Sequence, residues 1–327
     1  MPVTEAIIAI TSRCNAKCAM CEMWRRDPGD EVEPSYYYRL PQSLRNVNIT
    51  GGEPFMRKDI AQIVTVISDR CRGVRPVISS NGFLTSRILE AAPKLLKINP
   101  RTAFRISIDG IGNVHDEIRG IRGGFEKAAA TLKGLRKLGA PDLGIGFTLV
   151  RGNEREMMRV FQMSRQLGVQ FTSTVAHSSP IFFGDQDAQT PDVELARTAF
   201  RDLKKAQLRL MHPKNWFRAY FTEGVIDMLE GRKRRIVCPA LEAFFFLDPH
   251  GIVFPCHILD SPLGKLTDAP FEELVEGHPE ILKQVRTCPE HCWMTCTVAP
   301  QMKREIVSVT NWAIRSKIAA HTGWGSH

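Results

Sequence analysis

The chain has 327 residues and a net charge of +9, from 44 Lys and Arg against 35 Asp and Glu. This excess predicts an anionic partner. Nucleic acid is not the expected partner, because the sequence has no nucleic-acid motif and no basic stripe interleaved with aromatic residues. The hydrophobic fraction of 43% and charged fraction of 24% indicate a globular protein with ample core, long enough for two domains or one large barrel with an appendage.

The nine cysteines are an odd number, and no signal peptide precedes them. The apolar run 5–10 is too short to be a signal peptide or to cross a bilayer. An odd count in a chain without an export signal favours reduced thiols and metal binding over disulfides. We therefore expect a cytoplasmic protein.

Short apolar runs recur along the first half of the chain, with segments of helical period between most of them. The runs predict strands at 6–11, 47–50, 76–80, 104–108, 143–150 and 170–175. The segments between them predict amphipathic helices at 57–71, 84–98, 124–139 and 153–167. Such alternation indicates parallel βαβ units. We predict an α/β fold, a partial (β/α)6 TIM-type barrel, with a doubly wound sheet as the alternative.

The pattern changes after Pro180. Two helices are expected, and they end in the basic run GRKRR at 231–235. This run could contact an anionic partner, and a solvated linker explains it equally well. Two apolar strands then flank the hairpin turn signal DPHG at 248–251. The expected helices lie at 191–211, 214–230 and 304–320. The expected domains are the barrel (1–180), a helical linker (181–236), a small C-terminal β-hairpin plus helix domain (237–300) and a tail with an amphipathic helix (301–327).

Three cysteines, Cys14, Cys18 and Cys21, follow the first expected strand. A structural zinc site normally closes four ligands, and a disulfide framework needs even numbers. In a βα barrel the carboxyl ends of the strands build the active site. Three thiols at that edge could hold three irons of a cubane cluster and leave the fourth iron open to a ligand. A buried or zinc-bound cysteine cluster is the alternative.

The next strand ends carry GGEP (51–54), SSNG (79–82) and SIDG (107–110). The triad C-x3-C-x2-C, with Met20 before its last cysteine, followed by these motifs, resembles the radical S-adenosylmethionine (SAM) superfamily over most of residues 1–175. The resemblance implies a [4Fe–4S] cluster that binds SAM and, with one electron, cleaves it to methionine and a 5′-deoxyadenosyl radical. It also implies an electron donor such as flavodoxin or ferredoxin.

The resemblance implies roles for the residues at the strand ends. The GGEP turn, through its carbonyls and Glu53, is expected to bind the methionine ammonium, and Arg119 to pair bidentately with the SAM carboxylate. The alternatives are a mere tight turn at Gly51 and Gly52, a helix cap at Asp109, and surface positions for His115 and Arg119. The expected SAM-binding residues are Met20, Gly51, Gly52, Glu53, Pro54, Ser80, Asn81, Ser107, Asp109, Arg119 and Leu149, with Phe147 beside the adenine.

A second set of cysteines lies in the C-terminal part. The spacing C-x12-G-x4-C from Cys238 to Cys256 resembles the entry to a SPASM domain or its shorter form, twitch. Five cysteines, rather than the seven of a full SPASM domain, favour twitch, with one auxiliary [4Fe–4S] cluster. A zinc knuckle is the alternative. The expected metal ligands are Cys14, Cys18, Cys21, Cys238, Cys256, Cys288, Cys292 and Cys296.

Only four of the five C-terminal cysteines are needed for one cluster. The spare thiol is either inert or a hydrogen-atom donor, which makes Cys288, Cys292 and Cys296 candidate catalytic residues. Their spacing of four predicts that they share one face of a helix, with Cys288 standing just outside it because Pro289 fits only the first turn. Cys71, late in an amphipathic segment, is expected in the core.

The resemblance predicts an enzyme of the oxidoreductase or epimerase type. We expect it to dehydrogenate, epimerise or form a bond at a C–H position of a polar or anionic substrate, such as a sugar, nucleotide, aminoglycoside-like or lipid-linked molecule. A peptide-modifying maturase is one alternative, disfavoured because no peptide-recognition segment precedes the barrel; a non-catalytic iron–sulfur or zinc redox sensor is another. The tail helix with Trp312, Arg315, Lys317 and Trp324 is expected to pack across the auxiliary domain, with membrane-surface contact as the alternative.

Overall fold

A nine-stranded sheet forms the centre of the molecule. The structure is a computed structural model that describes residues 2–184, 189–290 and 292–322. The strand order is β6-β5-β4-β3-β2-β1-β7-β8-β9. The first six strands are parallel throughout, so each needs a crossover connection to the next. In the described residues the sheet does not close between β6 and β9.

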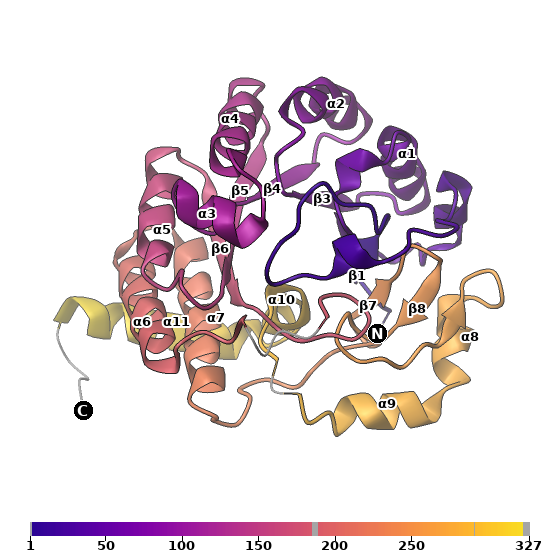
Figure 1. Ribbon diagram of the computed structural model, residues 1–327. Helices are drawn as coiled ribbons and strands as arrows, with labels where there is room; N and C mark the ends of the chain where they lie inside the picture. Colours follow the sequence, from indigo (N-terminus) through magenta and orange to yellow (C-terminus); the bar gives the residue numbers. More distant parts are fainter. Residues whose placement is uncertain (1, 185–188, 291, 323–327) are drawn as a thin grey trace.

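The six parallel strands and their helices form the predicted partial barrel (Figure 1). The strands are β1 (Glu5–Ala9), β2 (Asn46–Thr50), β3 (Arg75–Ser80), β4 (Ala103–Ser107), β5 (Asp142–Leu149) and β6 (Gln170–Val175). The helices are α1 (Ile60–Arg70), α2 (Thr85–Ile98), α3 (Asn113–Arg119), α4 (Gly124–Lys137) and α5 (Glu156–Gln166), with short 3-10 turns at Met23–Arg25, Pro34–Arg39 and Pro54–Met56. The predicted barrel is confirmed.

Burial explains why these segments became strands and helices. In β1, Ala6 to Ala9 are all buried, because helices cover the outer face and the inner face packs in the barrel. In α1 the buried residues recur at helical spacing on one face, at Ile60, Ile63, Val64 and Ile67. The core therefore lies on both faces of the sheet.

The helical segment after the barrel leads into the predicted hairpin. It contains α6 (Val193–Arg209) and α7 (Pro213–Leu229). Strands β7 (Phe244–Leu247) and β8 (Ile252–Phe254) pair antiparallel, as predicted, and β9 (Gly264–Lys265) pairs with β8. The Asp248 carboxylate accepts hydrogen bonds from the backbone N–H groups of His250 (2.9 Å) and Ile252 (2.7 Å), which fixes the turn.

The hairpin continues the sheet of the barrel. Strand β7 pairs in parallel with β1, with Glu5 opposite Phe244 and Ile8 opposite Leu247. All four residues of β7 are buried. The sequence pattern could not show this pairing, because periodicity reports which face of a strand is buried and not which strand lies next to it.

The chain ends with α8 (Phe271–Glu276), α9 (Pro279–Arg286), α10 (Thr295–Arg304) and α11 (Ile306–Thr322). The prediction that the last helix packs across the auxiliary domain is wrong for most of its length, because α11 packs mainly on α6 and α7. The Trp312 and Tyr220 rings lie 5.2 Å apart, and the Lys317 ammonium donates to the Leu208 carbonyl (2.7 Å). Trp324 lies outside the described residues. None of the described helices is long and apolar enough to cross a membrane.

Candidate functional site

The loop with the first three cysteines lies at the carboxyl ends of the barrel strands, beside α3 (Figure 1). Backbone hydrogen bonds join it to that helix: Lys17 N–H donates to Arg119 O (3.1 Å) and Ala19 N–H to Ile118 O (2.8 Å). The approach requires glycine at 120, which has a φ of +62° and where a Cβ would overlap Lys17 O. The loop is therefore positioned by the backbone.

The three thiols of this loop lie close to one another, with Cys18 buried and Cys14 and Cys21 half-buried. Burial raises the pKa of Cys14 to about 12, and the neighbouring Cys18 and Cys21 raise it further. Burial likewise raises the pKa of Cys21 to about 11 and that of Cys18, where Arg119 opposes the rise. Three adjacent thiolates need positive charge to be stable here. This donor set fits an iron–sulfur cluster, which binds thiolates.

The GGEP turn packs directly on the first loop. Gly52 N–H donates to Thr11 O (2.7 Å) and Glu53 N–H to Arg13 O (2.8 Å). A Cβ at Gly51 would overlap Thr11 O, and one at Gly52 would overlap Arg13 O. The two glycines are thus needed for the close approach of two backbones, which is more than a tight turn requires.

The Glu53 carboxylate is fully buried and joins the ends of β2 and β3. It accepts hydrogen bonds from Asn81 N–H (2.8 Å), Phe55 N–H (3.1 Å) and the Ser80 hydroxyl (2.9 Å). Burial raises its pKa to about 7, although these hydrogen bonds oppose the rise. Three protein donors already occupy the carboxylate, so its expected contact with SAM stays a prediction.

Asn81 connects the third strand end to the cysteine loop. Its Nδ2 donates to Asn15 Oδ1 (2.7 Å) and lies 4.0 Å from Cys14 Sγ. Pro54 is buried beside this region. The loops that follow β1, β2 and β3 therefore lie together, as predicted for neighbouring strands of a barrel.

Asp109 and Arg119 form a buried ion pair. Arg119 Nε lies 2.5 Å from Asp109 Oδ2, and Thr148 N–H donates to Asp109 Oδ1 (2.7 Å). The alternative that His115 and Arg119 lie at the surface is wrong, because these residues are only 0% and 9% exposed. The helix-cap alternative for Asp109 is also wrong, because α3 begins after Gly112 and has no side-chain cap.

Arg119 also faces the cysteine loop, with its Nη1 3.7 Å from Cys18 Sγ. Burial alone would lower the pKa of Arg119, but Asp109 and Cys18 raise it above its ordinary value. Arg119 therefore stays a cation between a carboxylate and a thiol. Its bidentate contact with SAM stays a prediction. Of the other expected SAM contacts, Met20, Phe147 and Leu149 are buried, and Ser107 is half-buried at the end of β4.

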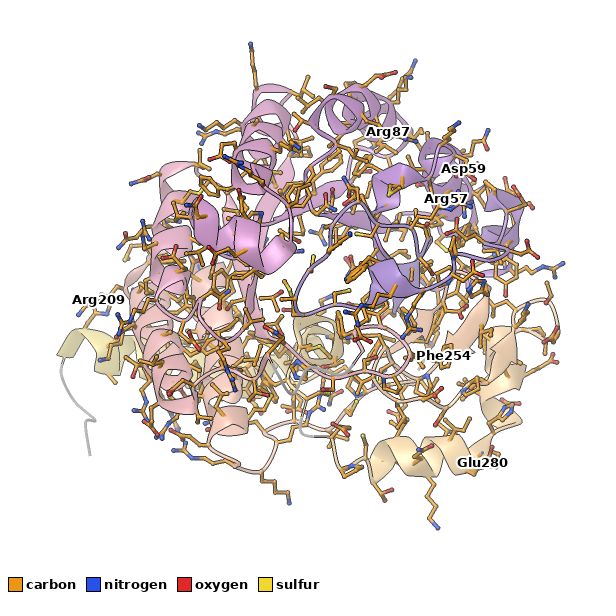
Figure 2. All side chains as sticks on the ribbon, viewed as in Figure 1. Arg57, Asp59, Arg87, Arg209, Phe254 and Glu280 are labelled. Atoms are coloured by element: carbon orange, nitrogen blue, oxygen red, sulfur yellow. The ribbon has the colours of Figure 1, made fainter. Side chains whose placement is uncertain are left out.

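A buried polar network that the sequence did not reveal supports the same loop. Arg57, 8% exposed, donates to Ile10 O (3.1 Å) and pairs with Asp59 (2.6 Å) and Glu31 (3.5 Å). Figure 2 shows Arg57 and Asp59 side by side. Glu31 Oε1 accepts from the Thr11 hydroxyl (2.5 Å). Glu31, Thr11 and Ile10 lie far from Arg57 in sequence, so spacing gave no signal for their contacts.

The C-terminal cysteines form a second group. Burial raises the pKa of Cys256 to about 12 and that of Cys292 to about 11, and in both thiols Cys238 adds to the rise. Burial also raises the pKa of Cys288, with a contribution from Cys238. Four thiols from three segments thus lie close enough to affect one another. The side chain of Cys296 lies outside the described residues.

The helix expected to carry Cys292 and Cys296 begins later than predicted, while Cys288 lies outside it as expected. Helix α9 ends at Arg286, and α10 begins only at Thr295, so Cys288 and Cys292 precede the helix and only Cys296 lies on it. Pro289 gives a reason, because the residue before a proline is disfavoured in helical conformation. Cys71 is fully buried, with its Sγ 3.3 Å from Pro41 O, as expected of a core residue.

Comparisons with known proteins agree with this geometry. Residues 8–163 match the family model described as the Radical SAM superfamily. An AdoMet-dependent heme synthase of Methanosarcina barkeri is 26% identical over 321 residues, which cover 90% of this chain and 87% of that protein. The sporulation killing factor maturation protein SkfB of Bacillus subtilis is 24% identical, over 87% of this chain and 67% of that protein.

Among solved structures, native anSMEcpe with bound AdoMet and Cp18Cys peptide has the same fold. Its TM-score is 0.66 at 14% identity, and the alignment covers 96% of this chain and 99% of that one. The fold, the cysteine loop and the family match define a radical SAM enzyme. Residues 8–163 belong to the radical SAM superfamily. The cofactors of this family are SAM and the [4Fe–4S] cluster that binds SAM.

Proposed function

We propose that Cys14, Cys18 and Cys21 ligate the SAM-binding cluster and that the surrounding strand ends bind SAM. The observation that carries this assignment is the loop itself. It places three thiols, one buried and two half-buried, together at the carboxyl ends of parallel strands, with the Arg119 cation 3.7 Å from Cys18 Sγ. When bound, the cluster supplies the electron that cleaves SAM and so gives a radical that abstracts hydrogen from the substrate.

The protein's own residues hold this arrangement. Gly51 and Gly52 let the GGEP turn approach the cysteine loop, so that free carbonyls of the turn can accept from the methionine ammonium. The Asp109 carboxylate fixes the Arg119 guanidinium, whose remaining N–H groups can donate to the SAM carboxylate. Met20 and Leu149 supply apolar surface for the adenine.

We further propose that Cys238, Cys256, Cys288 and Cys292 ligate the auxiliary cluster. The support is the proximity of these thiols, because Cys238 adds to the rise in the pKa of the other three, and Cys256 and Cys292 are buried. Cys296 is then the spare thiol, inert or a hydrogen-atom donor. Among the described residues, no three His, Cys, Asp or Glu side chains converge on a single metal ion.

The substrate has two candidates, and the relatives favour both over the sugar, nucleotide or lipid-linked molecule expected from the sequence. The first is a peptide, because SkfB, a maturation protein, is similar over 87% of this chain. The second is a tetrapyrrole, because a heme synthase is similar over 90% of this chain and 87% of its own length. The net charge of +9 suits the carboxylates of a tetrapyrrole or an acidic peptide.

The test is anaerobic incubation of the reconstituted chain with SAM and dithionite. Formation of 5′-deoxyadenosine is expected for an enzyme, and its absence would support the redox-sensor alternative. Added iron coproporphyrin and added candidate peptides are then compared as substrates by mass spectrometry. A mass change in one class, matched by increased 5′-deoxyadenosine, identifies the substrate class.

A further inference from the structure

The basic run 231–235 lies next to the C-terminal cysteines, and its residues have different surroundings. Arg232 pairs with Asp227 (2.9 Å) and Glu230, and Arg235 pairs with Asp227 and Glu223 (3.4 Å). Lys233 is exposed. Arg234 faces inward, with its Nη1 3.8 Å from Cys292 Sγ. The solvated-linker explanation thus holds for part of the run and not for Arg234.

Arg234 is held over a rigid aromatic platform. Its guanidinium carbon lies 5.7 Å from the centroid of the Trp293 ring, a cation–π arrangement. Trp293 is 1% exposed and donates from Nε1 to Phe221 O (2.8 Å). Gly224 of α7 is required there, since a Cβ at this position would overlap the indole. The platform, and with it the guanidinium, is fixed to α7.

The guanidinium has hydrogen-bonding capacity that the described residues leave unused. Arg234 Nε and Nη2 are buried, and neither has a hydrogen-bond partner in the described part of the chain. Such groups are costly to bury unless something in the complete protein satisfies them. A thiolate or sulfide of a cluster is an acceptor of the right charge.

The electrostatic effect of Arg234 is directed at two of the four thiols. Burial raises the pKa of Cys292 and of Cys288, and Arg234 opposes the rise in both. Cys238 adds to the rise in both pKa values; at Cys288 the backbone N–H of Glu290 opposes the rise and its charge adds to it. Arg234 therefore favours negative charge at this edge of the cysteine group.

We propose that Arg234 is a positioning residue that raises the reduction potential of the auxiliary cluster through Cys292. Reduction by one electron adds negative charge to a cluster already held by thiolates, and a fixed guanidinium stabilises that charge. Hydrogen bonds to the sulfurs and net charge are known determinants of cluster potentials. The proposal rests on the assignment of the auxiliary cluster to Cys238, Cys256, Cys288 and Cys292.

The test is a potentiometric titration of the reconstituted full-length chain, followed by electron paramagnetic resonance. Arg234→Gln is expected to lower the ratio of reduced to oxidised auxiliary cluster at fixed potential about tenfold, which is about 59 mV for one electron. Lys233→Gln, the matched control, removes the same charge one residue away and should leave the potential unchanged. The SAM-binding cluster in each sample serves as an internal reference, and Arg234→Lys should retain most of the wild-type potential.

Several outcomes would overturn the proposal. One is an unchanged reduction potential of the auxiliary cluster in Arg234→Gln with about eight irons bound. Another is a shift of this potential in Lys233→Gln equal to that in Arg234→Gln. If Arg234→Gln loses the auxiliary irons, the iron content of Arg234→Lys decides between two explanations. Retention of the auxiliary irons in Arg234→Lys supports a need for positive charge, and their loss shows that Arg234 acts only by packing. A wild-type chain with about four irons would fail at the earlier step and refute the auxiliary cluster itself.

Discussion

The two cysteine groups are held together in different ways. Cys14, Cys18 and Cys21 follow one strand in a single loop, which backbone hydrogen bonds join to α3 and to the GGEP turn. The C-terminal thiols come from three segments, before β7, after β8 and before α10. Backbone contacts therefore shape the first loop. On the proposed ligand assignment, the second cluster would join segments that are far apart in sequence.

The arginine beside each cysteine group has a different charge environment. Arg119 is neutralised by the buried Asp109 carboxylate, so the pair adds little net charge to the first site. Arg234 has no carboxylate partner among the described residues, so its charge acts on the thiols. The first arrangement favours fixed geometry for a ligand, and the second favours control of a potential.

Removal of the first group should have the largest effect. In a Cys14→Ala, Cys18→Ala, Cys21→Ala triple variant we expect no detectable 5′-deoxyadenosine and a fall from about eight to about four irons per chain. The loss occurs because no thiolates remain to hold the SAM-binding cluster, while the second group is untouched. Iron analysis and chromatography of the products measure this. Residual SAM cleavage would show that the cluster is ligated elsewhere.

A substitution at Gly52 tests the claim that backbone contacts shape the first site. In Gly52→Ala the new Cβ would overlap Arg13 O, a backbone atom that cannot rotate away. We expect a loss of about 1–3 kcal/mol in unfolding free energy, typical of overpacking, together with loss of the first cluster only. Gly146→Ala is the control, because a Cβ there meets nothing within 4 Å. Chemical denaturation and iron counts compare the two.

The claim that the second cluster holds distant segments together predicts an effect on stability. In a Cys238→Ala, Cys256→Ala double variant the auxiliary irons should be lost and Tm should fall by several degrees, since about 1 kcal/mol corresponds to roughly 2–4 °C in a chain of this order of size. The triple variant of the first loop should show a smaller fall. Calorimetry under anaerobic conditions tests this, and equal falls would remove the distinction between the sites.

The difference between the sites also explains what the sequence could predict. The six strands, the hairpin and the contiguous triad are local patterns, so periodicity, DPHG and spacing were enough to predict them. The contacts of Arg57 with Glu31 and of Arg234 with Cys292 depend on tertiary packing that no local pattern contains. The position of Cys288 outside the helix was predicted from Pro289, whereas the spacing alone could not show that the helix begins only at Thr295, after Cys292.

A smaller effect is expected at Arg119. Arg119→Lys should weaken SAM binding by about 1–3 kcal/mol, because lysine keeps the charge but cannot contact Asp109, Cys18 and a carboxylate at once. Arg122→Lys is a matched control, since Arg122 is exposed three residues later. Equilibrium binding of SAM to the reconstituted chain measures both. Unchanged affinity in Arg119→Lys would limit Arg119 to its ion pair.

The smallest effect concerns the pH dependence of the polypeptide that shapes the first site. Burial raises the pKa of Glu53 from 4.5 to about 7. Between these two values the folded chain holds a proton on Glu53 that the unfolded chain has released. The contribution of Glu53 to stability therefore decreases as pH rises through this window and is lowest above pH 7.

Glu53→Gln removes this titration and keeps the side chain's shape. In the iron-free chain, the fall in unfolding free energy between pH 5 and pH 7.5 should be smaller in Glu53→Gln than in the wild type, by a difference on the order of 1–3 kcal/mol. Glu126→Gln, at an exposed position in the first turn of α4, should keep the wild-type profile. Urea denaturation across this range measures the profiles. Identical profiles for all three chains would mean that the Glu53 carboxylate is not held in a buried site without iron, and the first loop would then depend on its cluster as the second group does.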